Sequence, residues 1–292
     1  MATELATLRL ASSRSLSYAF TTPPSGSSSP VVLLSNSLCA PFTCWDPVVP
    51  KLASLGFSVL RYDQPGHGDS GVPEVLSSTT FESMVDDAHE MLSQLGIKKV
   101  HAWIGVSMGA ATGIVFAAKY PGLVERLVPC DTISCSPANA GSADVFGPRV
   151  TATREAGNVD ALVEGTMERW FGSAWMEANA AETERMRKEM RRTTVEGFET
   201  CCTALRSTTF DLRPLAAKAG AGVDSAMLLV GSKDANLPET MQGLREGVEK
   251  GLNEKSGNAK YVELKVIKDA GHVCFIDGFD SFVSHVSKFL TA

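Results

Sequence analysis

The chain has 292 residues, of which 44% are hydrophobic and 21% are charged. This composition is typical of a soluble globular protein with a substantial core. The formal net charge of -6 and the pI of about 5.5 argue against a nucleic-acid-binding surface, and no apolar run is long enough to span a bilayer.

The seven cysteines occur at spacings that match no metal site. They predict reduced thiols in an intracellular protein, because disulfides persist mainly in oxidising compartments. The Ser-rich first forty residues, with Arg9 and Arg14, faintly resemble a transit peptide. We favour instead two short strands over 7–10 and 15–21 followed by a turn over 23–30, and we expect a cytoplasmic protein.

Strands and helices alternate from residue 31 onward, which predicts an α/β protein with a mostly parallel sheet covered by helices on both faces. Strands are expected over 31–35, 57–62, 100–104, 127–130, 227–231 and 261–267. Helices are expected over 46–55, 80–95, 108–119 and a C-terminal segment from about 279 to 290. The helix over 80–95 has a clear start signal, in which Thr79 and Glu82 form a capping box.

The alternation stops between residues 133 and 212, where several helical patterns follow one another and no strand pattern occurs. We therefore expect an α/β-hydrolase-like core made from residues 1–132 and 213–292, with residues 133–212 inserted as a helical cap. Residues 182–192 are highly charged. A solvated helix face explains this segment better than attraction of an anionic substrate.

Gly105-Val106-Ser107-Met108-Gly109 is a G-x-S-x-G motif between an expected strand and an expected helix. This is the context of a nucleophile elbow, in which a sharp turn lifts the serine hydroxyl clear of the sheet. The flanking glycines remove side chains that would collide in such a turn. Ser107 is therefore the candidate nucleophile, since the bare pattern is weak but its setting is specific.

A serine hydroxyl needs a base that removes its proton. His272 follows the last expected strand, and the chain order nucleophile, acid, histidine places the base there. His67, in a glycine-rich loop, is the rival, for which a structural role is favoured. The acid that orients the histidine is expected at Asp234, and Asp131, after the strand that follows the elbow helix, is the competing candidate.

Acyl transfer also needs backbone N–H donors for the developing oxyanion. Met108, the residue after the nucleophile, is expected to supply one of them. The loop after the strand over 31–35 is expected to supply the other, and Leu38 is the candidate. The alternative for this loop is a plain polar turn.

From about residue 31 to the C-terminus, the chain is similar to the α/β-hydrolase superfamily and, within it, to the 3-oxoadipate enol-lactonases. The resemblance is carried by Ser35-Asn36-Ser37-Leu38, Trp45-Asp46-Pro47, Arg61-Tyr62-Asp63, Gly66-His67-Gly68, the elbow, Arg169-Trp170-Phe171 and Cys201-Cys202-Thr203-Ala204-Leu205-Arg206. The last two segments are the more specific matches. The resemblance implies a cap over the active site, substrate contacts from Ser37 and Trp170, and no metal or organic cofactor; packing inside the cap is an equal alternative for Trp170.

The chain departs from the family pattern at Pro65, where Arg is usual, and at Cys39 and Ala110, where Gly is usual. The stretch over 247–260 is longer than expected, and the run over 273–275 is more apolar. The loss of a cation at position 65 argues against a small dicarboxylate lactone as the substrate. A more apolar lactone or ester becomes an alternative.

The leading hypothesis is a serine hydrolase that cleaves a lactone or carboxylic ester through an acyl-enzyme. The alternatives are C–C bond hydrolysis, lyase or rearrangement chemistry on the same fold, and a non-catalytic ligand receptor. A small molecule is the expected partner. The sequence leaves the oligomeric state open, and a homodimer is one arrangement that we consider.

Overall fold

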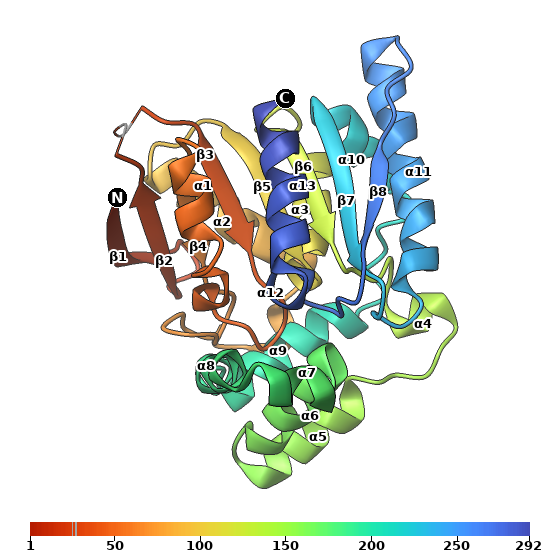
Figure 1. Ribbon diagram of the computed structural model, residues 1–292. Coiled ribbons are helices and arrows are strands. Elements are labelled where there is room, and N and C mark those ends of the chain that lie inside the picture. The colour runs from red at the N-terminus through yellow and green to blue at the C-terminus, as the bar shows by residue number, and fades with distance from the viewer. Residues whose placement is uncertain (25, 27) are drawn as a thin grey trace.

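The computed structural model describes residues 1–24, 26 and 28–292. Within this part of the chain, eight strands form one sheet in the order β1-β2-β4-β3-β5-β6-β7-β8 (Figure 1). The strands are β1 (Ala2–Arg9), β2 (Ser15–Thr22), β3 (Val31–Ser35), β4 (Ser58–Tyr62), β5 (Val100–Val106), β6 (Val124–Cys130), β7 (Ser225–Gly231) and β8 (Glu263–Ile267). β2 is antiparallel to both neighbours, and the pairs from β4 to β8 are parallel. The predicted α/β fold with a mostly parallel sheet is confirmed.

The strand bounds agree with the predictions to within three residues, except in β1. β3 has the expected bounds, whereas β1 begins at Ala2, well before the expected start at Thr7. The reason is pairing, because β1 bonds to β2 in register from Ala2 opposite Thr22 to Arg9 opposite Ser15. A pattern search along β1 alone misses this. The turn expected over 23–30 includes residues 25 and 27, which lie outside the described residues.

Helices cover both faces of the sheet and bury two separate apolar clusters (Figure 1). One face carries α2 (Phe81–Gln94), α3 (Met108–Lys119), α10 (Ala216–Gly222) and α11 (Leu237–Ser256). The other carries α1 (Val49–Ser54), α12 (Cys274–Asp277) and α13 (Phe279–Thr291). On this second face the rings of Trp45 and Phe275 stack with centroids 3.7 Å apart. The apolar run over 273–275 is therefore core packing beneath α13.

Two local predictions about helix starts are wrong. The helix expected over 46–55 is a short 3-10 turn at Phe42–Trp45 followed by α1, which begins only at Val49. The capping box of α2 is formed by Thr80 and Ser83, not by Thr79 and Glu82. The Thr79 hydroxyl is instead bonded to that of Thr200, 2.6 Å away in the buried interior.

The helices of the expected cap lie together beyond one end of the sheet (Figure 1). They are α4 (Pro137–Ala140), α5 (Gly147–Ala156), α6 (Asp160–Phe171), α7 (Ser173–Ala178), α8 (Ala180–Met190) and α9 (Val195–Arg206). Cys135 and Asp211 form an isolated bridge where this segment leaves and rejoins the rest. The helical content agrees with the expectation, while the division at residues 132 and 212 stays a prediction.

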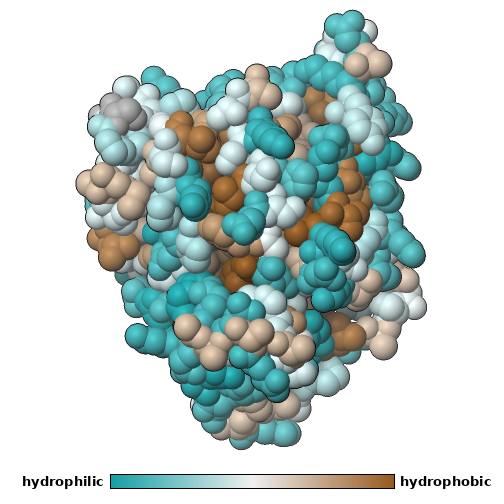
Figure 2. All heavy atoms as spheres, in the orientation of Figure 1, coloured by the Kyte–Doolittle hydropathy of each residue, from teal (hydrophilic) through white to brown (hydrophobic). Residues whose placement is uncertain are grey.

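The arginines of the charged segment are held in ion pairs on the outside of the cap. Arg187 pairs with Glu164 at 2.7 Å, and Arg192 pairs with Asp69 at 2.9 Å. Hydrophilic residues cover this side of the cap (Figure 2). Because these cations are already neutralised, the solvated-face interpretation fits them better than recruitment of a substrate.

One edge of the cap is tied to the core through backbone atoms. The Thr194 N–H, just before α9, donates to the Gly66 carbonyl at 2.9 Å. A Cβ on either Gly66 or Gly197 would overlap backbone atoms of the other. Two glycines therefore let α9 and the loop after β4 approach to backbone contact.

No helix among the described residues is both long enough and apolar enough to cross a membrane. The seven cysteines are free and buried, so no disulfide bond among them stabilises the fold. The fold is therefore stabilised by its two apolar clusters. The carboxyl ends of the parallel strands lie at the edge of the sheet that faces the cap (Figure 1). That edge is where open α/β sheets place their ligands.

Candidate active site

Ser107 occupies a strained turn between β5 and α3. Its backbone has φ 54° and ψ -116°, a combination that residues with a side chain rarely adopt. Its N–H donates to the Cys130 carbonyl at 2.8 Å, which ties the turn to the end of β6. A Cβ on Gly105 would overlap the Gly109 carbonyl, and one on Gly109 would overlap the Ser35 carbonyl. Both glycines of the motif are thus required by close backbone approach.

His272 lies in the loop between β8 and α12, next to the carboxylate of Asp234 from the loop after β7. The His272 Nδ1 donates to Asp234 Oδ2 at 2.7 Å, and the two side chains are only 18% and 13% exposed. A carboxylate can only accept, so this contact assigns the hydrogen to Nδ1 and leaves Nε2 with a free lone pair. The imidazole is thereby prepared to accept a proton at Nε2.

Asp131 lies close by but serves a different partner. Its Oδ1 accepts the Gly231 N–H at 2.7 Å, and the residue is fully buried with φ 47°. Burial, and next the neighbouring Asp234 carboxylate, raise the pKa of Asp131 well above its ordinary value. Of the two candidate acids, the structure brings Asp234 to hydrogen-bonding distance of His272, while Asp131 supports the end of β7.

A cavity of about 410 Å³ opens beneath the cap and joins the residues predicted from the sequence. Both Ser107 and His272 line it, and so do Ser37, Leu38, Met108 and Trp170. The remaining lining residues are Cys39, Thr132, Ile133, Val145, Phe146, Arg149, Leu162, Thr166, Arg169, Phe198, Leu205, Asp234, Ala235, Asn236 and Leu237. The sequence thus selected residues from five separate segments that meet at one hollow.

Trp170 lines the cavity and also packs inside the cap, so its position is compatible with either of its two expected roles. Its ring centroid lies 5.6 Å from that of His272 and 6.3 Å from that of Phe171. A Cβ on Gly271 would overlap the Trp170 carbonyl. The cap backbone at Trp170 therefore contacts Gly271, the residue before His272.

Two arginines in the cavity wall were not singled out by the sequence. Arg149, in α5, and Arg169, in α6, both line the cavity, and neither forms an ion pair or hydrogen bond with the described residues. Burial raises the pKa of Cys39, and the charges of Arg169 and Arg149 act in the opposite direction, so both arginines lie near that loop. Arg169 is partly open to solvent, yet burial and then Arg149 lower its pKa. Two like charges therefore lie close together, and neither is held in an ion pair with the described residues.

Sequence signals for these arginines differ. Arg169 belongs to the Arg169-Trp170-Phe171 match, a signal that could have identified it although no role was assigned to it. Arg149 follows Pro148 in a stretch without a motif, and only the fold of the cap brings it to the cavity. Pro65, the position at which the family usually has Arg, does not line the cavity.

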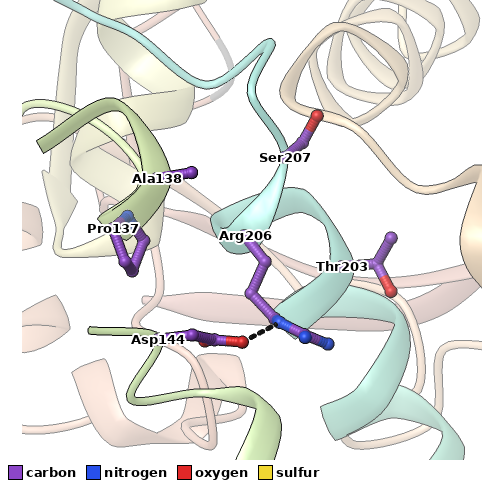
Figure 3. Close-up of a pocket in the computed structure, with 6 residues that line it drawn as sticks. All are labelled: Pro137, Ala138, Asp144, Thr203, Arg206 and Ser207. Atoms are coloured by element: carbon purple, nitrogen blue, oxygen red, sulfur yellow. Dashed lines mark hydrogen bonds and ion pairs between the residues drawn. The ribbon is translucent and has the colours of Figure 1, made fainter. Parts of the chain in front are cut away.

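A second hollow lies at the base of the cap and has no comparable chemistry (Figure 3). Its volume is about 480 Å³, and it is lined by Pro137, Ala138, Asp144, Thr203, Arg206 and Ser207. Arg206 and Asp144 pair with each other at 2.6 Å, so their charges are satisfied. No base among the described lining residues stands beside Ser207. The cavity at Ser107 is therefore the candidate active site.

Comparison with known proteins agrees with this architecture. The model of the alpha/beta hydrolase fold family matches residues 30–279. The 3-oxoadipate enol-lactonase 1 of Acinetobacter baylyi is 31% identical over 180 residues, which cover 60% of this chain and 62% of that relative. The zearalenone hydrolase of Cladophialophora bantiana is 28% identical over 149 residues, which cover 50% of this chain and 54% of that relative. The chain thus spans less than two thirds of these curated relatives.

Similarity to a solved structure extends over the whole chain. The crystal structure of the enol-lactonase from Burkholderia xenovorans LB400 superposes with a TM-score of 0.82 at 30% identity. The match covers 98% of this chain and 100% of that chain. The two chains therefore share one overall fold along their whole length.

Proposed function

We propose that this chain, which belongs to the α/β-hydrolase fold family, is a serine hydrolase that cleaves a lactone or carboxylic ester through an acyl-enzyme. The proposal depends on one observation, the 2.7 Å contact of His272 with Asp234 at a cavity that Ser107 also lines. An imidazole oriented in this way can accept the proton of a serine hydroxyl. The similarity to two enol-lactonases supports an ester-type bond as the target.

The proposed reaction has two half-reactions. Ser107 Oγ attacks the acyl carbon while His272 Nε2 takes its proton, and Asp234 stabilises the imidazolium that results. The oxyanion accepts hydrogen bonds from the Leu38 and Met108 N–H groups. The imidazolium then gives its proton to the departing alkoxide, which in a lactone stays attached to the acyl group. Finally, His272 activates a water molecule that hydrolyses the acyl-enzyme.

The charge of the cavity favours a substrate that carries a carboxylate. Arg149 and Arg169 repel each other, neither forms an ion pair with the described residues, and the Asp234 carboxylate, which is bonded to His272, attracts Arg169 only through space. A bound carboxylate would relieve this repulsion and accept charge-assisted hydrogen bonds from both guanidinium groups. The rest of the wall is largely apolar, with Phe146, Leu162 and Phe198. The proposed substrate is therefore a lactone or ester with an apolar frame and one anionic group.

This proposal revises the expectation derived from position 65. The missing Arg at Pro65 suggested a cavity without a cation, but Pro65 does not contribute to the wall. The two cap arginines supply positive charge instead. A carboxylated substrate is consequently compatible with the departures from the family pattern.

The nucleophile is tested with Ser107→Ala and a panel of lactones and aryl esters. We expect hydrolysis by the wild type and a loss of about 10⁴-fold or more in the variant. Labelling with a fluorophosphonate should modify Ser107 in the wild type. Full activity of Ser107→Ala would overturn the proposal. A labelled enzyme that leaves all esters intact would favour the C–C bond alternative.

The charge preference is tested with pairs of esters that differ only in a carboxylate and its neutral methyl ester. In Arg149→Gln and Arg169→Gln, kcat/KM for the acid should fall by about tenfold or more, since a charge-assisted hydrogen bond contributes about 1.5–3 kcal/mol. The neutral ester should change little. Arg187→Gln, which alters an ion-paired arginine outside the cavity, is the matched control. Equal losses for both esters would refute the anionic subsite.

A further inference from the structure

The loop after β4 binds the candidate oxyanion loop through its side chains at regular intervals. Asp63 Oδ1 accepts the Phe42 N–H at 2.6 Å, and Gln64 Nε2 donates to the Asn36 carbonyl at 2.7 Å. Cys39 lies midway between Asn36 and Phe42, and its N–H donates to His67 Nε2 at 2.9 Å. The whole cluster is buried. Each end and the middle of residues 36–42 are thus bonded to one neighbouring loop.

The partners of His67 fix its tautomer. Its Nδ1 lies 2.9 Å from the Pro65 carbonyl, which can only accept, so Nδ1 carries the hydrogen. Nε2 is then unprotonated and can receive the Cys39 N–H. Burial lowers the pKa of His67 to about 4, so the ring stays neutral near pH 7. No other side chain or backbone group among the described residues takes the Cys39 N–H.

Cys39 needs such support because of its backbone. Its φ of 67° lies in the left-handed region, where a side chain is unfavourable and glycine is preferred. Cys39 directly follows Leu38, the candidate oxyanion donor, and both line the cavity. The adjacent Leu38 N–H has no acceptor among the described residues, so it remains available as a donor to a ligand in the cavity.

We propose that His67 is a positioning residue, whose acceptor nitrogen holds Cys39 in its left-handed conformation and thereby aims the Leu38 N–H at the oxyanion. The inference rests on the proposed acyl transfer. His67 touches neither the substrate cavity nor the reacting atoms, since it does not line the cavity. It acts through the backbone of the loop.

Two amide variants separate the hydrogen bond from the shape of the ring. In His67→Gln, the side-chain oxygen can reach the place of Nε2 and accept the Cys39 N–H. In His67→Asn, the shorter amide can replace Nδ1 only, so the acceptor is lost. We expect kcat to fall about 10²-fold in His67→Asn, the loss expected from a misplacement of about 1 Å, with KM changed less than about threefold. His67→Gln should stay within about fivefold of the wild type, as partial compensation allows.

Hydrogen exchange gives a readout that does not need turnover. In His67→Asn, exchange of amides in residues 36–42 should accelerate by about tenfold or more, whereas His67→Gln should retain protection. His89→Asn is the control, because this histidine stacks on Tyr120 away from the cavity. Melting temperatures of the variants identify any that fail to fold.

The outcomes distinguish the two proposals. If the wild type hydrolyses no ester, the proposed function fails, and the exchange experiment still decides the role of His67. If both amide variants lose the same activity, or if His67→Asn exchanges its loop amides like the wild type, His67 is a packing residue and the inference is overturned. A drop confined to KM would also contradict it.

Discussion

Exchange of each of the two acids for its amide separates the roles of Asp234 and Asp131. Asp234→Asn keeps the shape of the side chain but removes the negative charge 2.7 Å from His272 Nδ1. The amide can also present its NH₂ and force the wrong tautomer. An exchange of this kind in a serine protease triad lowers kcat about 10⁴-fold, which corresponds to about 5 kcal/mol of barrier. We expect a loss of this size.

Asp131→Asn, in contrast, should leave catalysis nearly unchanged. The amide oxygen can still accept the Gly231 N–H, and burial and Asp234 already raise the pKa of Asp131 so that it favours the neutral form. We therefore expect kcat within about threefold of the wild type. Asp131→Ala, which leaves the buried Gly231 N–H without a partner, should lower stability by about 1–3 kcal/mol.

Stability of the Asp131 variants should also depend on pH in a defined direction. The pKa of Asp131 is higher in the folded than in the unfolded protein. The resulting stabilisation is complete below the unfolded pKa of about 4 and is lost as pH rises toward the folded pKa. Asparagine does not titrate, so Asp131→Asn should gain stability relative to the wild type as pH rises from about 4 to 8.

The assays are initial rates on an ester that the wild type hydrolyses, together with urea unfolding at several pH values. Asp131→Asn measured at pH 5 and pH 8 supplies the internal control for the stability argument. If Asp131→Asn loses as much kcat as Asp234→Asn, Asp131 is the acid that serves His272. If its relative stability falls with rising pH, the ionisation argument is wrong.

Three further changes test packing around the site. Gly109→Ala places a Cβ against the Ser35 carbonyl and should lower the free energy of unfolding in urea by about 1–3 kcal/mol. The control Gly243→Ala, which has open space around its Cβ, should be neutral or stabilising. Similar values for both variants would refute the close-approach argument. Phe275→Ala removes the ring stacked on Trp45 and should lower stability by about 3–5 kcal/mol, measured by calorimetry. Gly197→Ala pushes on Gly66 and should reduce kcat together with stability, so an unchanged kcat would show that the loop tolerates the shift.

The sequence was informative where chemistry depends on chain order. A strand, a motif and a helix located Ser107, and the sequence order of acid and histidine located Asp234 and His272. These signals work because parallel strands deliver the loops after them to one edge of the sheet. Asp131 stayed a competitor, since both acids follow strands at that edge and only three-dimensional contacts separate them.

Features that depend on distant partners could not be predicted. Thr79 and Thr80 are equivalent capping residues in a local pattern, and a buried bond from Thr79 to Thr200, far along the chain, decides between them. Arg149 acquires its role only when α5 folds across the cavity. His67 was assigned a structural role, but its actual partner, the Cys39 N–H, is set by the packing of two loops.

The backbone contact between α9 and the loop after β4 has a consequence for how molecules reach Ser107. Backbone contact at Thr194, Gly66 and Gly197 leaves no room for a substrate to pass between α9 and that loop. At the α5 side, Val145 lines the cavity and is 50% exposed. We therefore expect substrates to enter the cavity from the α5 side.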